Sequence, residues 1–330
     1  MKSLRITSNE DAKIYLLEEE VDDPSDTQVQ VEVITSVVSP GTERAFILSM
    51  ENTDKSYPRT LGYSVAGIVT KVGSNVKGFK PGDRVAGILA HRTIGNIEQH
   101  NLVHIPNGVT FEEAAFVRIG VIAMQAVRKA RIELGEGVLV FGLGLIGQMA
   151  MQLAKANGAL PIIGIDVVES KLELAKINGC TYTFDANMKN LEQEFKNVNN
   201  GCLPQVVIES TGFPEPIKLS LRYACNLGRV IILGSTRGNT EINFYKDIHK
   251  KGLVVIGAHI STNPAMQSYT AHWCFRDNAL CFLNLLKEKR INVTSLISQK
   301  ESFENFNNIY KNVLERNDDY ITSVITWKWR

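Results

Sequence analysis

The stretch Val138–Gly147 constrains the fold of this 330-residue chain more than any other. Four apolar, mostly strand-prone residues precede Gly142, Gly144 and Gly147, and Gln148–Asn157 then has a helical pattern. This Gly-x-Gly-x-x-Gly spacing is typical of a dinucleotide-binding turn, because the glycines permit a tight turn, a close approach to a pyrophosphate and helix packing on the strand. We expect the phosphates at the helix N-terminus, where unpaired N–H groups point outward.

The residues that follow the glycine motif indicate which dinucleotide binds. Leu160–Ile165 has the pattern of a buried strand and ends in Asp166, which is 166 minus 147, or 19, residues after Gly147. An acidic residue about 20 residues on would hold a ribose 2'-hydroxyl, and its charge would repel a 2'-phosphate, so we expect NAD as the cofactor. Lys171 could cover the adenosine side. The alternative is a glycine-rich turn in another kind of α/β unit.

Five apolar runs separated by helical patterns predict a doubly wound parallel sheet. The strands are expected at Val138–Phe141, Leu160–Ile165, Gln205–Glu209, Arg229–Leu233 and Leu253–Ile256. The carboxyl edge of such a sheet receives the ligand, and small residues follow several of these strands. The expected cofactor contacts are therefore Gly142, Gly144, Leu145, Ile146, Gly147, Asp166, Lys171, Thr211, Gly234, Ser235 and Ala258.

Length and charge limit the remaining possibilities. A chain of 330 residues is long enough for two domains. The formal net charge is +1, so nothing in it suggests binding to nucleic acid or to an anionic membrane. No apolar segment follows the first residues as a signal peptide would require, and we expect a cytoplasmic protein. None of the five cysteines forms a Cys-x-x-Cys pair, which favours reduced thiols over a zinc cluster.

The first third of the chain has a different pattern from the part around the glycine motif. Residues 2–106 form short alternating strands with turn signals between them, as in Gln28–Val33, which predicts an all-β module. A helical stretch, Phe111–Ala130, is expected to lead into the nucleotide-binding domain. Two further helices and a closing strand, Ile321–Trp327, are expected to return to the first domain. We therefore expect one domain at 1–121 and 265–330 and a second at 122–264, in an α/β fold.

Several motifs resemble those of the medium-chain dehydrogenase/reductase superfamily, that is, the superfamily of zinc-binding alcohol dehydrogenase-like proteins. The resemblance covers essentially the whole chain and implies a Rossmann-type domain beside a GroES-like catalytic domain. A narrower likeness, to a branch that includes bacteriochlorophyllide a dehydrogenase, depends on three short segments. The motifs that carry the two resemblances are Ser39–Glu43, Leu61–Val69, Pro81–Val85, the glycine motif with Asp166 and Lys171, Glu209–Gly212, Gly41–Arg44, Asp247–Leu253 and Ile256–His259.

The departures from that superfamily concern its metal sites. Many members hold a catalytic zinc through positions that match Pro40, Tyr63 and Arg118 in this chain, and none of the three is a usable zinc ligand. Ser64 likewise replaces the glutamate of the family's Gly-His-Glu motif. The four-cysteine loop that binds a structural zinc should follow Val85, and it is missing. The sequence therefore predicts no zinc of either kind.

Without a metal, side chains must handle the proton that accompanies hydride transfer. Thr42 matches the family's relay hydroxyl, although it could be a turn residue only. Tyr63 could donate to a carbonyl oxygen, but a phenol is a poor base unless a cation such as Arg118 lowers its pKa. In the alternative account, Arg118 and Glu43 form an ion pair that fills the vacated metal site and both are structural.

Two histidines are further catalytic candidates. His259 follows the last predicted strand of the sheet, where it should lie near the nicotinamide. His91 follows the turn at Gly82 and Asp83 and could face the same ligand. The remaining histidines, His100, His104, His249 and His272, are expected to be structural or solvated.

These observations predict a zinc-independent, NAD-dependent oxidoreductase that interconverts a secondary alcohol and a ketone on a polyol, sugar-like or larger ring substrate. Two alternatives stay open at this stage: an enoyl- or quinone-type C=C reductase, and a nucleotide-binding sensor without catalysis. The resemblance also implies a homodimer or a dimer of dimers, joined through the strand Leu253–Ile256.

Overall fold

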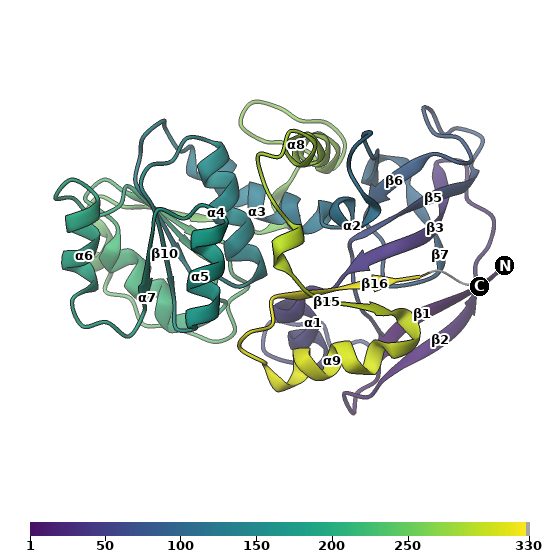
Figure 1. The fold of residues 1–330 in the computed structure, drawn as a ribbon, viewed down its shortest axis with the longest axis horizontal. Coiled ribbons are helices and arrows are strands. Elements are labelled where there is room, and N and C mark those ends of the chain that lie inside the picture. Colours follow the sequence, from purple (N-terminus) through teal and green to yellow (C-terminus); the bar gives the residue numbers. More distant parts are fainter. Residues whose placement is uncertain (328–330) are drawn as a thin grey trace. The chain divides into compact units, whose positions relative to one another are not determined.

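Two units make up residues 1–327, the part of the chain that this computed structural model describes (Figure 1). The first unit contains Met1–Val121 and the chain from Pro264 onward, and the second contains Ile122–Asn263. Helix α3 (Val117–Ala130) carries the chain from the first unit into the second. The predicted fold class, a parallel doubly wound sheet plus a mostly β domain, is confirmed.

The second unit is built on a six-stranded sheet with the order β11-β10-β9-β12-β13-β14, in which all neighbouring strands are parallel. Its central strand β9 is buried along its whole length, as its unbroken apolar sequence requires. The strands are β9 (Val138–Phe141), β10 (Ile162–Asp166), β11 (Tyr182–Asp185), β12 (Val206–Glu209), β13 (Arg229–Ile232) and β14 (Val254–Gly257).

The strand order reverses between β9 and β12, which places a topological switch point there, where such sheets bind ligands. Helix α4 contacts β9 and β10, α5 contacts β10 and β11, and α7 contacts β12 and β13. The helices of this unit are α4 (Leu145–Ala156), α5 (Glu169–Ile177), α6 (Leu191–Val198) and α7 (Pro214–Tyr223), with a π-helix η2 (Phe244–His249) and a short η3 (Ile260–Thr262).

The five strands predicted from the sequence are present in the second unit, and a sixth, β11, was not predicted. Tyr182–Asp185 alternates polar and apolar residues over only four positions, and none of its side chains is buried. An edge strand pairs on one side only and needs no continuous apolar run, so periodicity gave little signal here.

The first unit contains a three-stranded sheet with the order β2-β1-β4 and a seven-stranded sheet. In the larger sheet the order is β15-β16-β3-β5-β6-β8, and β7 also pairs with β3. The closing strand β16 pairs antiparallel with β3, so segments almost 300 residues apart share one sheet. The strands are β1 (Lys2–Ser8), β2 (Ile14–Glu20), β3 (Gln28–Val37), β4 (Arg59–Thr60), β5 (Val65–Val72), β6 (Arg84–Gly87), β7 (Ile94–Glu98), β8 (Leu102–His104), β15 (Ile297–Ser302) and β16 (Thr322–Thr326).

The helical stretch predicted at Phe111–Ala130 is broken into two helices. Thr110 caps the first, α2 (Phe111–Ala114), in a reciprocal capping box with Glu113. Ser64 lies at the break and its hydroxyl donates to the carbonyl oxygen of Ala115. The other helices of the unit are α1 (Pro40–Ile47), α8 (Phe275–Lys287) and α9 (Phe306–Glu315), with short turns η1 (Gln99–Asn101), η4 (Thr294–Leu296) and η5 (Phe303–Asn305).

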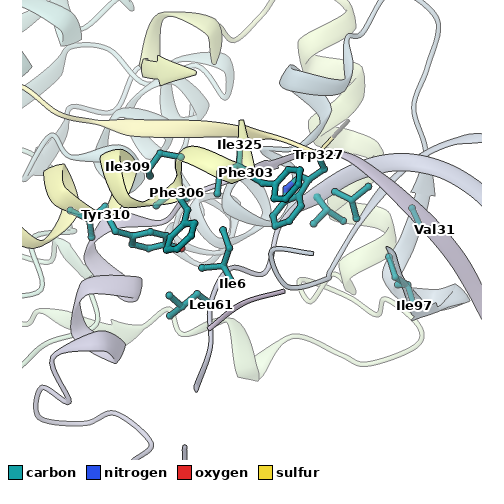
Figure 2. Packing of buried hydrophobic residues seen from close by; sticks show 14 of the residues in the cluster. Ile6, Val31, Leu61, Ile97, Phe303, Phe306, Ile309, Tyr310, Ile325 and Trp327 are labelled. Atoms are coloured by element: carbon teal, nitrogen blue, oxygen red, sulfur yellow. The ribbon is translucent and has the colours of Figure 1, made fainter. Parts of the chain in front are cut away.

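Buried apolar side chains from the N-terminal strands and the C-terminal segment form one core in the first unit (Figure 2). The ring of Phe303 stacks on that of Trp327 with centroids 5.2 Å apart. Tyr310 and Ile309 of α9 pack in the same cluster as Ile6 and Leu61. The C-terminal segment therefore completes the core on which α1 and its neighbours lie. Within residues 1–327, no helix combines the length and the apolar character that crossing a membrane requires.

Candidate functional site

The glycine turn of the second unit has the form that a pyrophosphate requires. Gly142 has a φ of +86°, a conformation that side chains disfavour. A Cβ atom at Gly147 would collide with the carbonyl oxygen of Gly142, so only glycine lets α4 pack this closely on the turn. A Cβ atom at Gly144 would meet nothing within 4 Å, and no side chain caps the helix there. Leu145 and Ile146 begin α4, where free backbone amides are available to an anion.

Asp166 lies at the end of β10 and is fastened to the glycine turn. Its Oδ2 accepts a hydrogen bond from the backbone N–H of Leu143 at 2.6 Å, and its Oδ1 accepts from Val167 at 2.8 Å. Each carboxylate oxygen accepts two hydrogen bonds, so Oδ2 keeps capacity for a ribose hydroxyl. Lys171 is partly buried on α5, and its carbonyl oxygen accepts from Gln148 of α4 at 2.9 Å. The residues present fit a dinucleotide.

A buried carboxyl group, Glu209, organises the neighbouring edge of this sheet, and the sequence analysis gave it no such role. Its Oε1 accepts from the backbone N–H of Thr211 at 2.7 Å and from the Thr211 hydroxyl. Its Oε2 has no hydrogen-bond partner among the described residues. Burial raises the pKa of Glu209 above its ordinary value. A charged residue at the end of an apolar strand was the signal that could have identified it.

Glu209 also restricts the loop after β13. A Cβ atom at Gly234 would lie 2.6 Å from the Gly212 amide nitrogen and 3.0 Å from Glu209 Oε2, so this position requires glycine. Ser235 is exposed beside it, and Ala258 is buried after β14. The cofactor residues predicted from the sequence lie at the carboxyl ends of β9, β10, β12, β13 and β14 and in the first turns of α4 and α5, all in the second unit.

His259 is exposed in the second unit, just beyond β14. Its Nδ1 lies 2.7 Å from the Ser261 hydroxyl and also accepts the Ser261 backbone N–H, which caps η3. Its ring is therefore held by local contacts within its own turn.

In the first unit, three hydroxyl groups from two segments come together. Ser39 and Thr42 lie at the start of α1, and Tyr63 lies between β4 and β5. The Ser39 and Thr42 side chains lie close enough to the Tyr63 hydroxyl to lower its pKa. Burial raises the pKa of Tyr63, and this effect exceeds the lowering by Ser39, Thr42 and the nearby Arg118 cation. The idea that Arg118 turns Tyr63 into a base is therefore wrong, and the phenol stays protonated at neutral pH.

Beneath these hydroxyls lies a buried hydrogen-bonded chain that contains Glu43 and His91. Glu43 Oε1 accepts from the Ser39 backbone N–H at 2.7 Å and lies 3.2 Å from His91 Nε2. Glu43 Oε2 accepts the Tyr310 hydroxyl at 2.6 Å. On the other side of the ring, His91 Nδ1 lies 2.8 Å from the Ser36 hydroxyl, which accepts from the Trp327 indole N–H at 2.8 Å.

This arrangement corrects two expectations. His91 is 0% exposed and Glu43 is 1% exposed, so neither faces a ligand as a catalytic group would. The predicted ion pair between Glu43 and Arg118 does not form. The Glu43 carboxylate instead interacts with the Ser39 backbone N–H, the His91 ring and the Tyr310 hydroxyl. Glu43 instead fixes the first turn of α1, which carries Thr42. We therefore assign Glu43 and His91 as positioning residues.

Arg118 lies at the start of α3, next to the hydroxyl cluster. Its backbone N–H donates to the Ser64 hydroxyl at 3.0 Å, and Ser64 in turn donates to Ala115. Its guanidinium lies 5.7 Å from the centre of the Phe275 ring. Burial lowers the pKa of Arg118, and Tyr63 opposes this change. Ser64, in the place of a family glutamate, thus holds the helix that positions the cation.

Pro40, Tyr63 and Arg118, at the positions that match the family's zinc ligands, do not fit a zinc ion. The matching positions hold an imino acid, a phenol with a raised pKa and a guanidinium, whereas zinc is bound by thiolate, imidazole or carboxylate. Among residues 1–327, no group of three or more His, Cys, Asp and Glu residues is placed to hold a metal.

Comparison with known proteins places the two units in one family. A model described as the alcohol dehydrogenase GroES-like domain matches residues 25–131, and a model described as zinc-binding dehydrogenase matches residues 146–274. The chain is 26% identical to galactitol 1-phosphate 5-dehydrogenase of Escherichia coli over 283 residues, which are 76% of this chain and 79% of the relative. It is 32% identical to sorbitol dehydrogenase of Rattus norvegicus over 54% of this chain and 59% of that protein.

Solved structures share the fold over almost the whole chain. The crystal structure of galactitol-1-phosphate dehydrogenase from Escherichia coli has a TM-score of 0.86 at 21% identity, over 99% of this chain and all of that one (100%). That of 2R,3R-butanediol dehydrogenase from Bacillus subtilis has a TM-score of 0.84 at 19% identity and covers 98% and 99%. The two family models and the curated relatives, together with this shared fold, show that the chain belongs to the medium-chain dehydrogenase/reductase superfamily and is an oxidoreductase of the zinc-binding alcohol dehydrogenase-like type.

Proposed function

We propose that the protein is a zinc-independent, NAD(H)-dependent oxidoreductase that interconverts a secondary alcohol and a ketone on a polyol, sugar-like or larger ring substrate. The observation that carries this proposal is the group formed by Tyr63, Ser39, Thr42 and Arg118, in which Tyr63 and Arg118 occupy positions that match the family's zinc ligands in sequence. Relatives named as galactitol 1-phosphate and sorbitol dehydrogenases support a substrate with several hydroxyl groups.

The nicotinamide, when bound, supplies or accepts the hydride. In ketone reduction, Tyr63 would donate its phenolic proton to the carbonyl oxygen as the hydride reaches the carbon. The alkoxide that would otherwise form is much more basic than a phenolate, so this transfer is favourable even though the pKa of Tyr63 is raised. The Ser39 and Thr42 side chains interact with the phenol, and they would orient it and return the proton from solvent.

Asp166 supports NAD as the cofactor, and its substitution tests the choice. Wild-type protein should bind NAD about 10–100-fold more tightly than NADP, because the carboxylate accepts a ribose hydroxyl and repels a 2'-phosphate. Asp166→Ala should bring the two dissociation constants within about threefold of each other. Isothermal titration with both nucleotides measures the ratio.

Asp166→Asn is the matched control for that experiment. The amide keeps an oxygen that can accept from Leu143 or Val167, but it carries no charge. It should therefore lose the repulsion of NADP while disturbing the glycine turn less than alanine does. A wild-type preference for NADPH would contradict the proposal and would favour a C=C reductase of the enoyl or quinone type.

We further propose that two copies of the chain pair through β14 into a homodimer or a dimer of dimers. This strand is at the edge of the sheet, and the side chains of Val254 and Val255 are 50% and 43% exposed. Exposed apolar edge strands are prone to pair with another chain. The backbone N–H of Val254 donates to Gly228 within the sheet, so by alternation the N–H of Val255 faces the free edge.

Val255→Pro should convert the dimer into a monomer, because it removes an outward donor while the bonds to β13 remain. Sedimentation equilibrium at micromolar concentration measures the change in mass, and Val255→Ala serves as the control that keeps the donor. A wild-type protein that sediments as a monomer, or a proline variant that still dimerises, would rule out this interface.

A further inference from the structure

The Arg118 guanidinium is a cation that no carboxylate neutralises within the described chain. In residues 1–327, no Asp or Glu side chain lies within ion-pair distance of it. Its guanidinium lies 5.7 Å from the centre of the Phe275 ring, and Tyr63, whose phenol is uncharged at neutral pH, is the group that influences its pKa electrostatically. A partly buried charge without an opposite charge is costly, and a guanidinium cannot escape the cost by losing its proton.

The acidic group of this region is not available to Arg118. Glu43 interacts electrostatically with Tyr63, as Arg118 does. Both Glu43 oxygens are nevertheless occupied, by Ser39 and His91 on one side and by Tyr310 on the other. The fold therefore supplies partners for the Glu43 carboxylate and leaves the Arg118 guanidinium without a carboxylate partner among residues 1–327.

The groups around Arg118 are hydrogen-bond donors. Ser39, Thr42 and Tyr63 each carry a hydroxyl group, and Arg118 carries five N–H donors in a planar fork. A fork of this kind binds carboxylate and phosphate oxygens with two parallel hydrogen bonds. Ser64 accepts a hydrogen bond from the Arg118 backbone N–H, which fixes the point at the start of α3 from which the guanidinium extends.

We propose that the substrate of this enzyme carries an oxyanion group, a carboxylate or a phosphate, close to the carbon that is oxidised or reduced, and that Arg118 binds it. Arg118 then supplies specificity for hydroxy acids, oxo acids or sugar phosphates over neutral polyols. This assignment rests on the proposed function of Tyr63, because it is the neighbouring phenol that would reach the reacting oxygen. No covalent step is added to the reaction.

The test compares acids with their uncharged counterparts on the protein saturated with NADH. The pairs are acetate and acetamide, benzoate and benzamide, gluconate and gluconamide, and sorbitol 6-phosphate and sorbitol. Binding is measured by calorimetry and by the change in NADH fluorescence. At least one anion should bind about tenfold or more tightly than its neutral counterpart, as expected for a charge-assisted pair. Comparing the three carboxylates with sorbitol 6-phosphate shows which oxyanion the protein prefers.

Arg118→Gln should reduce that preference to less than about threefold and leave the affinity for NADH unchanged. Arg118→Lys keeps the charge but loses the fork, so it should retain part of the preference, and it also serves if the glutamine variant does not fold. Arg84→Gln is the matched control, because Arg84 lies in the first unit, is partly buried and also packs over an aromatic ring, that of Phe111, at 4.6 Å. This control should keep the full preference.

Three results would overturn the assignment: no anion in the panel is preferred, the preference survives Arg118→Gln, or Arg118→Gln weakens NADH binding about tenfold. The last result would mean that Arg118 contacts a cofactor phosphate. Failure of the proposed function looks different, because then wild-type protein would bind no NADH or would turn over no alcohol or ketone. Wild-type turnover of neutral ketones without an anion preference would reject only the oxyanion proposal.

Discussion

Replacing Glu43 with alanine should lower the free energy of unfolding of the first unit by about 3–5 kcal/mol. The substitution leaves the Tyr310 hydroxyl, the His91 ring and the Ser39 backbone N–H without their shared acceptor. Each of these groups is buried, so the variant leaves buried donors that have lost their acceptor. Urea unfolding followed by tryptophan fluorescence measures the loss. All three tryptophans belong to the chain from Pro264 onward, so the signal reports this unit.

Two further variants separate the hydrogen bonds from the simple loss of side-chain volume. Glu43→Gln keeps an acceptor oxygen of the same size and should cost only about 1–2 kcal/mol. Tyr310→Phe removes a single donor, and combined with Glu43→Ala it should add little further destabilisation, because the two groups share one contact. If Glu43→Ala costs less than about 1 kcal/mol, the buried chain does not stabilise the fold as we infer.

Replacing Tyr63 with phenylalanine should lower the turnover number about 100- to 1,000-fold without changing the affinity for NADH. The substitution keeps the ring and removes the proton donor to the substrate oxygen. In the wild type, ketone reduction should be insensitive to the state of Tyr63 up to about pH 10, because burial raises the pKa of this phenol. Above that pH the protonated form declines and the rate should fall. Assays of a panel of polyols, ketones and enones measure these effects.

Ser39→Ala and Thr42→Val serve as matched controls, because each removes one hydroxyl that lowers the pKa of Tyr63 and leaves the phenol in place. Each should reduce turnover less than Tyr63→Phe does. Treatment with a chelator should leave the wild-type rate unchanged, and elemental analysis should find no stoichiometric zinc. Activity that chelation abolishes and zinc restores would contradict the assignment of Tyr63, as would a fully active phenylalanine variant.

Local sequence patterns were sufficient for much of the second unit. The glycine turn, the helix that follows and the acidic residue at the end of β10 lie within 30 residues of one another, and their spacing has one mechanical interpretation. The sequence likewise showed that Pro40, Tyr63 and Arg118 differ from the family's zinc ligands, because these residues lie within recognisable motifs. The edge strand β11 was not predicted from the sequence, because it is short and has no buried side chain.

The sequence by itself therefore determined the fold class, the family and the kind of nucleotide turn, since these depend on periodicity and on residues close together in the chain. Only the tertiary structure decided the partners of Glu43, one of which, Tyr310, is 267 residues away. It also decided that Arg118 has no carboxylate partner in residues 1–327 and that His91 is enclosed. The physical reason is that hydrogen bonds between distant segments form only after β16 and α9 pack against the N-terminal strands, and no local pattern records that packing.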